Sequence, residues 1–198
     1  MALITDISQL DLTKSYTAAD YLTWRLDEFI ELIRGKVRLM SPAPRVRHQK
    51  VARNLVRAID HQLDESPCEV FFAPFDVRLT RTTGNGDAYI TTVVQPDICV
   101  VCDPAQLDEF GCVGAPNWII EILSPGSTTH DSKTKFELYQ ESGVQEYWLV
   151  DPGLKNVVIY SLQNGQYELR GEFFEPGRVP VAMRPELVVE WQDVFRGL

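Results

Sequence analysis

The sequence predicts one α/β domain with a mixed central sheet flanked by helices. Its 198 residues, 44% hydrophobic and 24% charged, match an ordinary globular domain with a sizeable core. The pattern of residues 117–152 predicts a strand, a turn, a helix and a second strand in one continuous unit. Further strands are predicted before and after this unit. The chain shows no internal repeat or linker, so we expect a tail over residues 1–16 and one domain over residues 17–198.

The first strand of this unit contains a single charged residue. The run WIIEIL is apolar and β-branched except for Glu121, which is typical of a buried strand. A carboxylate there is costly unless a partner compensates it. Asp97 opens another apolar strand directly after Pro96. Together the two acids form a pair of hard oxygen ligands suited to a divalent metal; the alternatives are a buried glutamate satisfied structurally and an aspartate that caps a turn.

A helix is expected from Asp131, a favourable N-cap residue, to Gly143, a favourable C-cap residue. Within it Asp131, Lys135 and Tyr139 recur every four residues and therefore lie on one stripe. The alternative interpretation is that Asp131 and Lys135 form a surface ion pair, which contributes about 0.3–0.5 kcal/mol.

Several segments together resemble the Uma-two family of restriction-endonuclease-like proteins, a branch of the PD-(D/E)XK nuclease superfamily. They are Pro96-Asp97, E-x-L-S-P at 121–125, D-x-x-x-K at 131–135 and EYWLVDP at 146–152. IELIRG, VRLMSPAP and His48 also match, so the resemblance extends from about Thr17 to Phe195. One position departs from the superfamily pattern: Leu123 stands where its lysine is expected. The resemblance implies that Lys135 takes over this role.

The resemblance implies a restriction-endonuclease-like fold and metal-dependent hydrolysis of phosphodiester bonds, with DNA as the expected substrate. Asp97, Glu121 and the backbone carbonyl of Ile122 would hold Mg²⁺ or Mn²⁺, which lowers the pKa of a bound water and stabilises charge on the phosphate. Lys135 would orient that water or stabilise the developing negative charge. A homodimer is expected as well, and no protein partner is inferred.

Two further residues are candidates for the catalytic centre. Glu31 lies in a predicted hairpin, 29–33 and 37–40, and the family pattern makes it a third acid near the metal; an outward polar residue is the alternative. His48 lies at the start of a helix predicted over 45–64 and matches a family histidine that would orient a phosphate or the attacking water. A surface or capping role is the alternative for His48.

The charge distribution is uneven along the chain. A formal net charge of −9 argues against binding nucleic acid through bulk charge. Residues 34–57 nevertheless contain eight basic residues and no Asp or Glu. Lys50, Arg53 and Arg57 lie beside the apolar stripe of the predicted helix and are candidate nucleic-acid contacts. The alternative is a solvated face balanced by acids from elsewhere in the fold.

The remaining elements follow from alternation and from turn residues. A capping box of Thr17 and Asp20 starts a short helix. The sequence further predicts strands at 68–80 with a bend at Pro74, 88–94, 146–150, 157–162, 167–174 and 187–190, a turn at 83–87, a loop over 103–116 and a short helix from Gln192.

Three other functions are alternatives to hydrolysis of nucleic acid. Ser124, His130 and Asp131 are neighbours in sequence without a nucleophile elbow, which excludes a serine hydrolase triad. A glycosidase built on Glu121 and Asp97 would have few aromatic residues nearby on which to stack a sugar. The serious alternative is a non-catalytic nucleic-acid-binding or dimerisation module that keeps the nuclease fold; binding of a divalent metal separates the two.

Four cysteines do not indicate a disulfide framework, and residues 99 and 102 of the C-x-x-C spacing face opposite sides of a strand. No apolar run is long enough to cross a bilayer, and the chain begins with no charged and apolar leader. A cytoplasmic protein is therefore expected.

Overall fold

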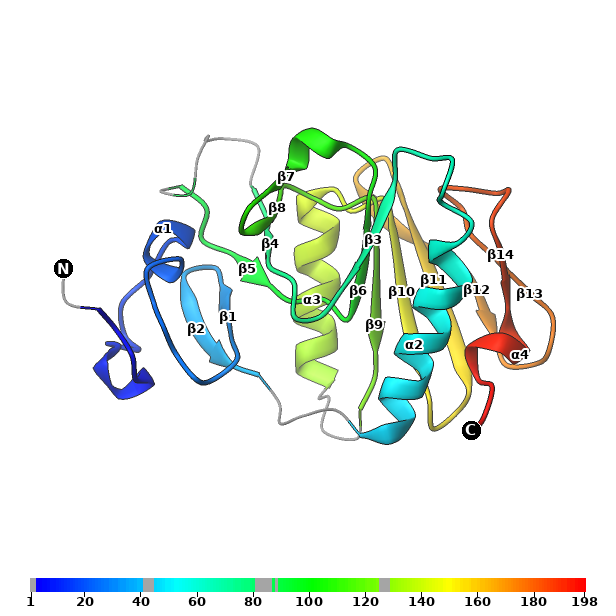
Figure 1. Cartoon of the computed structure of the whole chain (residues 1–198), viewed down its shortest axis with the longest axis horizontal. Helices are drawn as coiled ribbons and strands as arrows, with labels where there is room; N and C mark the ends of the chain where they lie inside the picture. Colours follow the sequence, from blue (N-terminus) through cyan, green and yellow to red (C-terminus); the bar gives the residue numbers. More distant parts are fainter. Residues whose placement is uncertain (1–2, 41–44, 81–86, 88, 125–128) are drawn as a thin grey trace.

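The computed structural model describes residues 3–40, 45–80, 87, 89–124 and 129–198. These residues form two six-stranded sheets and one two-stranded sheet, together with four α-helices (Figure 1). The termini lie at opposite ends of the molecule in this view. Most of the turn predicted at 83–87, Pro125 and Gly126 after the central strand, and Pro42 and Pro44 lie outside the described residues.

The larger sheet contains the central unit predicted from the sequence. Across the sheet its strands are β12 (Gln166–Phe173), β11 (Asn156–Gln163), β10 (Glu146–Asp151), β9 (Trp118–Ile122), β6 (Ile98–Val101) and β3 (Glu69–Phe72). β9 and β10 are parallel, and the other neighbours are antiparallel. The connection between the parallel pair contains helix α3 (Thr129–Ser142), because parallel strands need a long crossover. The predicted mixed sheet flanked by helices is confirmed.

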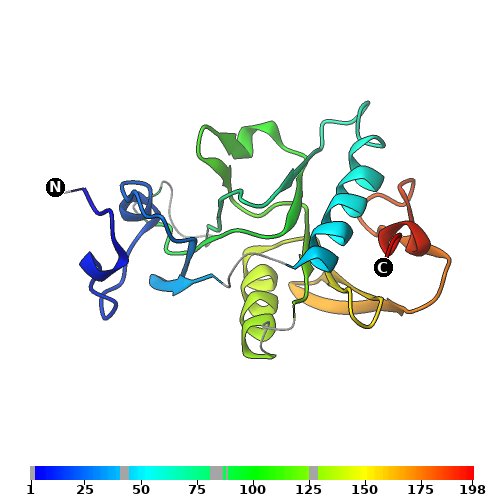
Figure 2. The same cartoon turned by 60° about the horizontal axis from the view of Figure 1, so that its bottom comes forward.

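Helices α2 (Val46–Asp60) and α3 cover opposite faces of this sheet (Figure 2). The alternation of strand side chains explains this arrangement. Trp118, Ile120 and Ile122 of β9 pack in one buried cluster with the apolar stripe of α2. Ile119 points to the other face and packs with Leu138 and Tyr139 of α3. A strand that is buried on both faces therefore has apolar residues at nearly every position, as WIIEIL has apart from Glu121.

The smaller six-stranded sheet lies on the N-terminal side of the molecule (Figure 1). Across it the strands are β2 (Lys36–Leu39), β1 (Ile30–Ile33), β5 (Val93–Val94), β4 (Val77–Arg78), β8 (Gly111–Val113) and β7 (Leu107–Asp108). The hairpin of β1 and β2 agrees with the sequence pattern.

Two strand predictions and one loop prediction in this part of the chain are wrong in detail. The strand expected over 68–80 is two strands, β3 and β4, which belong to different sheets, and the expected bend at Pro74 lies between them. The strand expected over 88–94 is reduced to β5. The loop expected over 103–116 instead contains a 3₁₀ helix (Pro104–Gln106) and strands β7 and β8, because β8 pairs with β4 from a distant part of the chain.

The N-terminal segment packs against the smaller sheet. A 3₁₀ helix, η1 (Ile7–Gln9), precedes α1 (Ala18–Tyr21), which begins with the predicted capping box of Thr17 and Asp20. Leu10 is buried in a cluster with Trp24 and Ile30. Of the described residues before Thr17, Leu10 is therefore packed into the fold, with Ile4 and Ile7 against the same cluster.

The helix ends follow their capping residues. Gly143 adopts a φ of +90°, in the left-handed region that glycine tolerates, and ends α3 as predicted. The helix begins at Thr129, so Asp131 lies in its first turn and is not the N-cap residue. Among the helices of the described residues, none is both long and apolar enough to cross a membrane.

A buried glutamate connects the C-terminal segment to β10. The last elements are β13 (Arg178–Pro180), β14 (Val188–Glu190) and α4 (Trp191–Val194). Glu146 is fully buried and accepts hydrogen bonds from the amides of Ala182 (3.0 Å) and Met183 (2.7 Å) and from the indole of Trp148 (2.7 Å). These bonds hold the segment between β13 and β14 against the start of β10.

The folded protein is expected to lose stability as the pH rises above the ordinary pKa of glutamate, about 4.3. Burial raises the pKa of Glu146, and the hydrogen bonds from Met183, Trp148 and Ala182 only partly oppose this. The folded state then retains a proton that the unfolded state has already lost, so the free energy of unfolding falls with pH in this window. Urea unfolding at several pH values should show a flatter dependence for Glu146→Gln, and an unchanged dependence would contradict this assignment.

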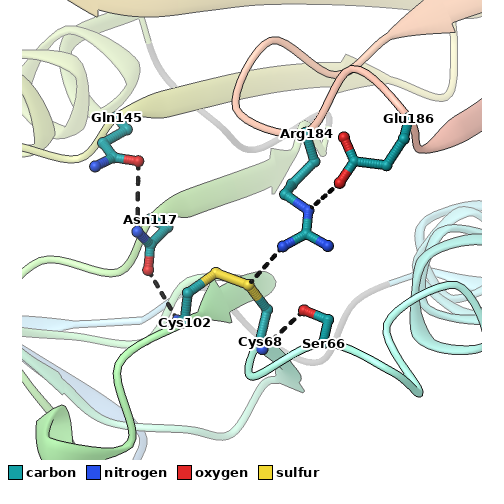
Figure 3. The surroundings of a disulfide bond; sticks show 7 residues. All are labelled: Ser66, Cys68, Cys102, Asn117, Gln145, Arg184 and Glu186. Carbon is teal, nitrogen blue, oxygen red and sulfur yellow. Dashed lines mark hydrogen bonds and ion pairs between the residues drawn. A yellow bond between two sulfur atoms is a disulfide. The ribbon is translucent and has the colours of Figure 1, made fainter.

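A disulfide joins Cys68 to Cys102 (Figure 3), although the four cysteines in the sequence did not indicate a disulfide framework. The two residues lie side by side because Glu69 pairs with Val101 in the adjoining strands β3 and β6. The side chain of Asn117 accepts a hydrogen bond from the amide of Cys102 (2.8 Å). Cys99 and Cys112 are buried free thiols, so the C-x-x-C residues are not bonded to each other.

Candidate active site

The candidate site lies at the carboxyl end of β9, where the chain passes twice between the two large sheets. Residues 73–76 lead from β3 to β4, and residues 95–97 lead from β5 to β6. The amide of Ala73 donates to the carbonyl of Asp97 (3.1 Å), which holds the two connections side by side. β6 runs antiparallel to β9, so its first residues lie beside the last residues of β9.

Glu121 shares the end of β9 with two side chains of α3. Its Oε1 accepts hydrogen bonds from the Lys135 ammonium (2.9 Å) and from the Tyr139 hydroxyl (2.6 Å). These are residues of the predicted stripe, one helical turn apart. Burial raises the pKa of Glu121 to about 7; Lys135 and Tyr139 oppose the rise, and the charges of Asp97 and Glu31 add to it. The centre therefore holds more negative charge than Lys135 alone balances.

Lys135 also connects this centre to the smaller sheet. Its Nζ lies 3.1 Å from Oε1 of Glu31, a residue of β1 that is 7% exposed. The same oxygen accepts a hydrogen bond from the amide of Gln95 (3.0 Å). Burial alone would lower the pKa of Lys135, but the carboxylates of Glu121 and Glu31 raise it, so the ammonium stays charged. Glu31 thus points into the site and not outward.

Asp97 and His48 form a second pair next to Glu121. Oδ1 of Asp97 lies 3.1 Å from Nε2 of His48, and Oδ2 accepts a hydrogen bond from the amide of Ile122 (2.7 Å). Burial lowers the pKa of His48, yet the hydrogen bond and the charge of Asp97, with Glu121, outweigh it and the net pKa is raised. His48 is buried in the first turn of α2, so neither a surface nor a capping role describes it.

A groove of about 1170 Å³ opens over these residues. Asp97, Glu121 and Lys135 line it, together with residues of the β1–β2 hairpin, of α2 and of the segment that follows β3. Arg53 and Arg57 of α2, two of the three candidate nucleic-acid contacts, also line the groove. Lys50 is absent from this lining, and its ammonium donates to the carbonyl of Gly197 (2.7 Å).

The sequence alone did not identify Tyr139 and Tyr147 as site residues. Tyr139 was on the expected stripe, and its spacing of four residues from Lys135 is the signal that could have found it. The hydroxyl of Tyr147 is buried beside the groove and makes no hydrogen bond within the described residues. Tyr147 is on β10, opposite Ile119, and nothing in the local sequence of β10 indicates this position.

The donor chemistry of the site suits a hard divalent cation. Asp97 and Glu121 supply carboxylate oxygens, and their mutual repulsion contributes to the raised pKa of Glu121. Within the residues that the structure describes, no three His, Cys, Asp or Glu side chains converge as a ready metal cluster. A cation held here would therefore use two carboxylates and the carbonyl of Ile122.

The fold, a mixed sheet with helices on both faces, places this chain among the restriction-endonuclease-like α/β proteins. A solved crystal structure, described as a "putative nuclease belonging to DUF820" from Anabaena variabilis, matches it with a TM-score of 0.69 and 26% sequence identity. The match covers 91% of this chain and 97% of that chain.

The chain belongs to the Uma2 family, whose description is "Putative restriction endonuclease". The family model matches residues 18–191, which confirms the resemblance predicted from the motifs. A relative from Synechocystis sp., "Uncharacterized protein slr1290", is 25% identical over 144 residues, or 71% of each chain.

Proposed function

We propose that this protein is a nuclease that hydrolyses phosphodiester bonds in DNA with the help of Mg²⁺ or Mn²⁺. The observation that carries the proposal is the buried Glu121, which faces Lys135 and Asp97 beneath a large groove. Membership of the Uma2 family and the likeness to a protein described as a nuclease support it.

The position of each site residue suggests its role in this reaction. Asp97, Glu121 and the carbonyl of Ile122 would hold the cation, which would lower the pKa of a bound water and offset charge on the phosphate. Lys135 carries a fixed positive charge into the site, where it can stabilise the negative charge that develops on the phosphoryl oxygens.

The residues around these groups keep them in position. His48 orients Asp97 through its Nε2 contact, and Glu31 and Tyr139 fix Lys135 and Glu121 from two sides. The carboxylates are therefore held in place before a substrate arrives, so little reorganisation accompanies the reaction.

A non-catalytic module on the same fold is the second candidate. One observation favours it: both oxygens of Asp97 are hydrogen bonded, and Oε1 of Glu121 is shared by two donors, so the polar groups are largely satisfied as they stand. A site retained for stability alone has no reason to bind a divalent cation.

Titration calorimetry with Mg²⁺ and Mn²⁺ should detect binding to the wild type and none to Glu121→Gln, and the wild type should cleave DNA whereas Glu121→Gln should not. Glu168→Gln, an exposed acid on β12, is the matched control and should behave as the wild type. Circular dichroism checks that all three are folded. Metal binding without cleavage of any nucleic acid would favour the non-catalytic module, and cleavage by Glu121→Gln would exclude the assigned site.

A further inference from the structure

The groove above the acidic centre has walls of two kinds. Charged side chains come from α2 and from Arg38 of β2 and make up the polar wall; large apolar side chains come from the rest of the β1–β2 hairpin and from the end of β3 and make up the apolar wall. With a volume of about 1170 Å³ it exceeds the roughly 300–1,000 Å³ typical of small-molecule sites. The groove therefore suits a segment of a polymer better than a single small ligand.

The polar wall presents guanidinium groups. Arg53 and Arg57 are one turn apart on the exposed side of α2, whose opposite side is in the core. Arg38 of β2 is the cross-strand partner of Glu31, so both side chains lie on the same face of the hairpin, toward the groove. α2 also contributes one acid to the groove lining, its last residue Asp60. Three guanidinium groups thus accompany Asp60 in this part of the lining and can bind phosphates, while the other acids of the described lining are Glu31, Asp97, Glu121 and Asp131.

The apolar wall exposes large side chains to solvent. Phe29, Leu39 and Phe72 are 62%, 63% and 60% exposed, although each lines the groove. Exposed apolar groups gathered at one site indicate a binding surface. Two of the three are phenylalanines. A phenyl ring can stack on any nucleobase, so it contributes affinity for nucleic acid without selecting a base sequence.

We propose that this groove binds single-stranded nucleic acid, with bases stacked on Phe29 and Phe72 and phosphates on the arginines. In a duplex the bases stack on one another and present only their edges in the grooves, so the two rings would have no base face to contact. The inference rests on the proposed nuclease function and deepens it, since it specifies unpaired strands as the form of substrate that reaches Glu121 and Lys135.

Fluorescence anisotropy in the presence of a chelator tests the inference without cleavage. The probes are a labelled oligothymidylate and the same strand paired with oligoadenylate. The single strand should bind more tightly than the duplex. Phe29→Ala and Phe72→Ala should each weaken it about 5- to 100-fold, and Arg57→Ala should reduce the salt dependence by a slope of about 0.7. Phe174→Ala and Arg170→Ala, exposed positions outside the groove lining, are the matched controls.

A positive signature is available from Phe72→Trp, whose fluorescence should be quenched by stacked bases and whose affinity should match that of the wild type. Duplex binding as tight as single-strand binding, or unchanged affinity in both alanine variants, would overturn the inference. So would a dimer in solution that Phe29→Ala dissociates, because a second copy of the chain would then cover the groove. Because the binding assay contains no free metal, its result does not depend on cleavage; a failure of the nuclease proposal is seen separately, as absence of cleavage when Mg²⁺ is added to a protein that binds the single strand.

Discussion

Replacing Lys135 with alanine is expected to abolish cleavage of nucleic acid while the protein remains folded. The Lys135 ammonium contacts both Glu31 and Glu121, so its loss leaves two carboxylates facing each other in a buried place. Removing one group that stabilises transition-state charge typically lowers kcat about 10²- to 10³-fold. The pKa of Glu121 should rise further, and a protonated Glu121 is a poor metal ligand, which adds to the loss.

Lys133→Ala is the matched control for this variant. Lys133 is on the same helix, but its side chain is 74% exposed and pairs only loosely with Glu137 (3.9 Å). Its replacement should leave the cleavage rate unchanged. Breaking a buried ion pair usually costs about 3–5 kcal/mol, but Glu121 can take up a proton and so reduce this cost. Initial rates and urea unfolding of both variants provide the measurement; wild-type rates in Lys135→Ala would remove Lys135 from the mechanism.

Reduction of the Cys68–Cys102 disulfide is expected to lower the free energy of unfolding by about 3–4 kcal/mol, because opening a closed loop of this length restores entropy to the unfolded chain. The two residues are 34 positions apart. For a domain of this size the loss corresponds to roughly 10 °C in the unfolding temperature. Scanning calorimetry with and without a reductant measures the difference.

The double variant Cys68→Ser/Cys102→Ser should no longer respond to reductant. A chemical count tests the bond independently. Cys99 and Cys112 are buried free thiols, so alkylation of the unfolded chain should label two cysteines without reductant and four with it. Four labelled cysteines in the absence of reductant would show that the bond does not form.

Local pattern was sufficient to predict much of the larger sheet. Each of its strands contains enough consecutive apolar or alternating residues to be recognised, and the fold class follows from the parallel pair β9 and β10. The smaller sheet was less predictable. β4, β5 and β7 have two residues each, too few for a periodic pattern; β4 and β5 are strands because distant segments pair with them, and β7 is a strand through its hairpin with β8.

The candidate site likewise combines features that local sequence pattern predicts with features that depend on distant parts of the chain. Spacing alone placed Lys135 and Tyr139 on one face of a helix, and the resemblance indicated Glu31 and His48. That Glu31 contacts Lys135 depends on how the two sheets meet, which no local pattern contains. Cys68 and Cys102 face each other only through the register of β3 and β6, so their pairing could not be predicted from spacing either.

The contact between Glu31 and Lys135 also bears on the timing of activity during synthesis. Glu31 comes from the early part of the chain, whereas Lys135 and its helix α3 come much later. α3 packs against Tyr147 of β10, so the helix can dock in its final position only after β10 has been synthesised. A nascent chain on the ribosome therefore lacks the assembled centre, and any nucleolytic activity begins only when the larger sheet is nearly complete.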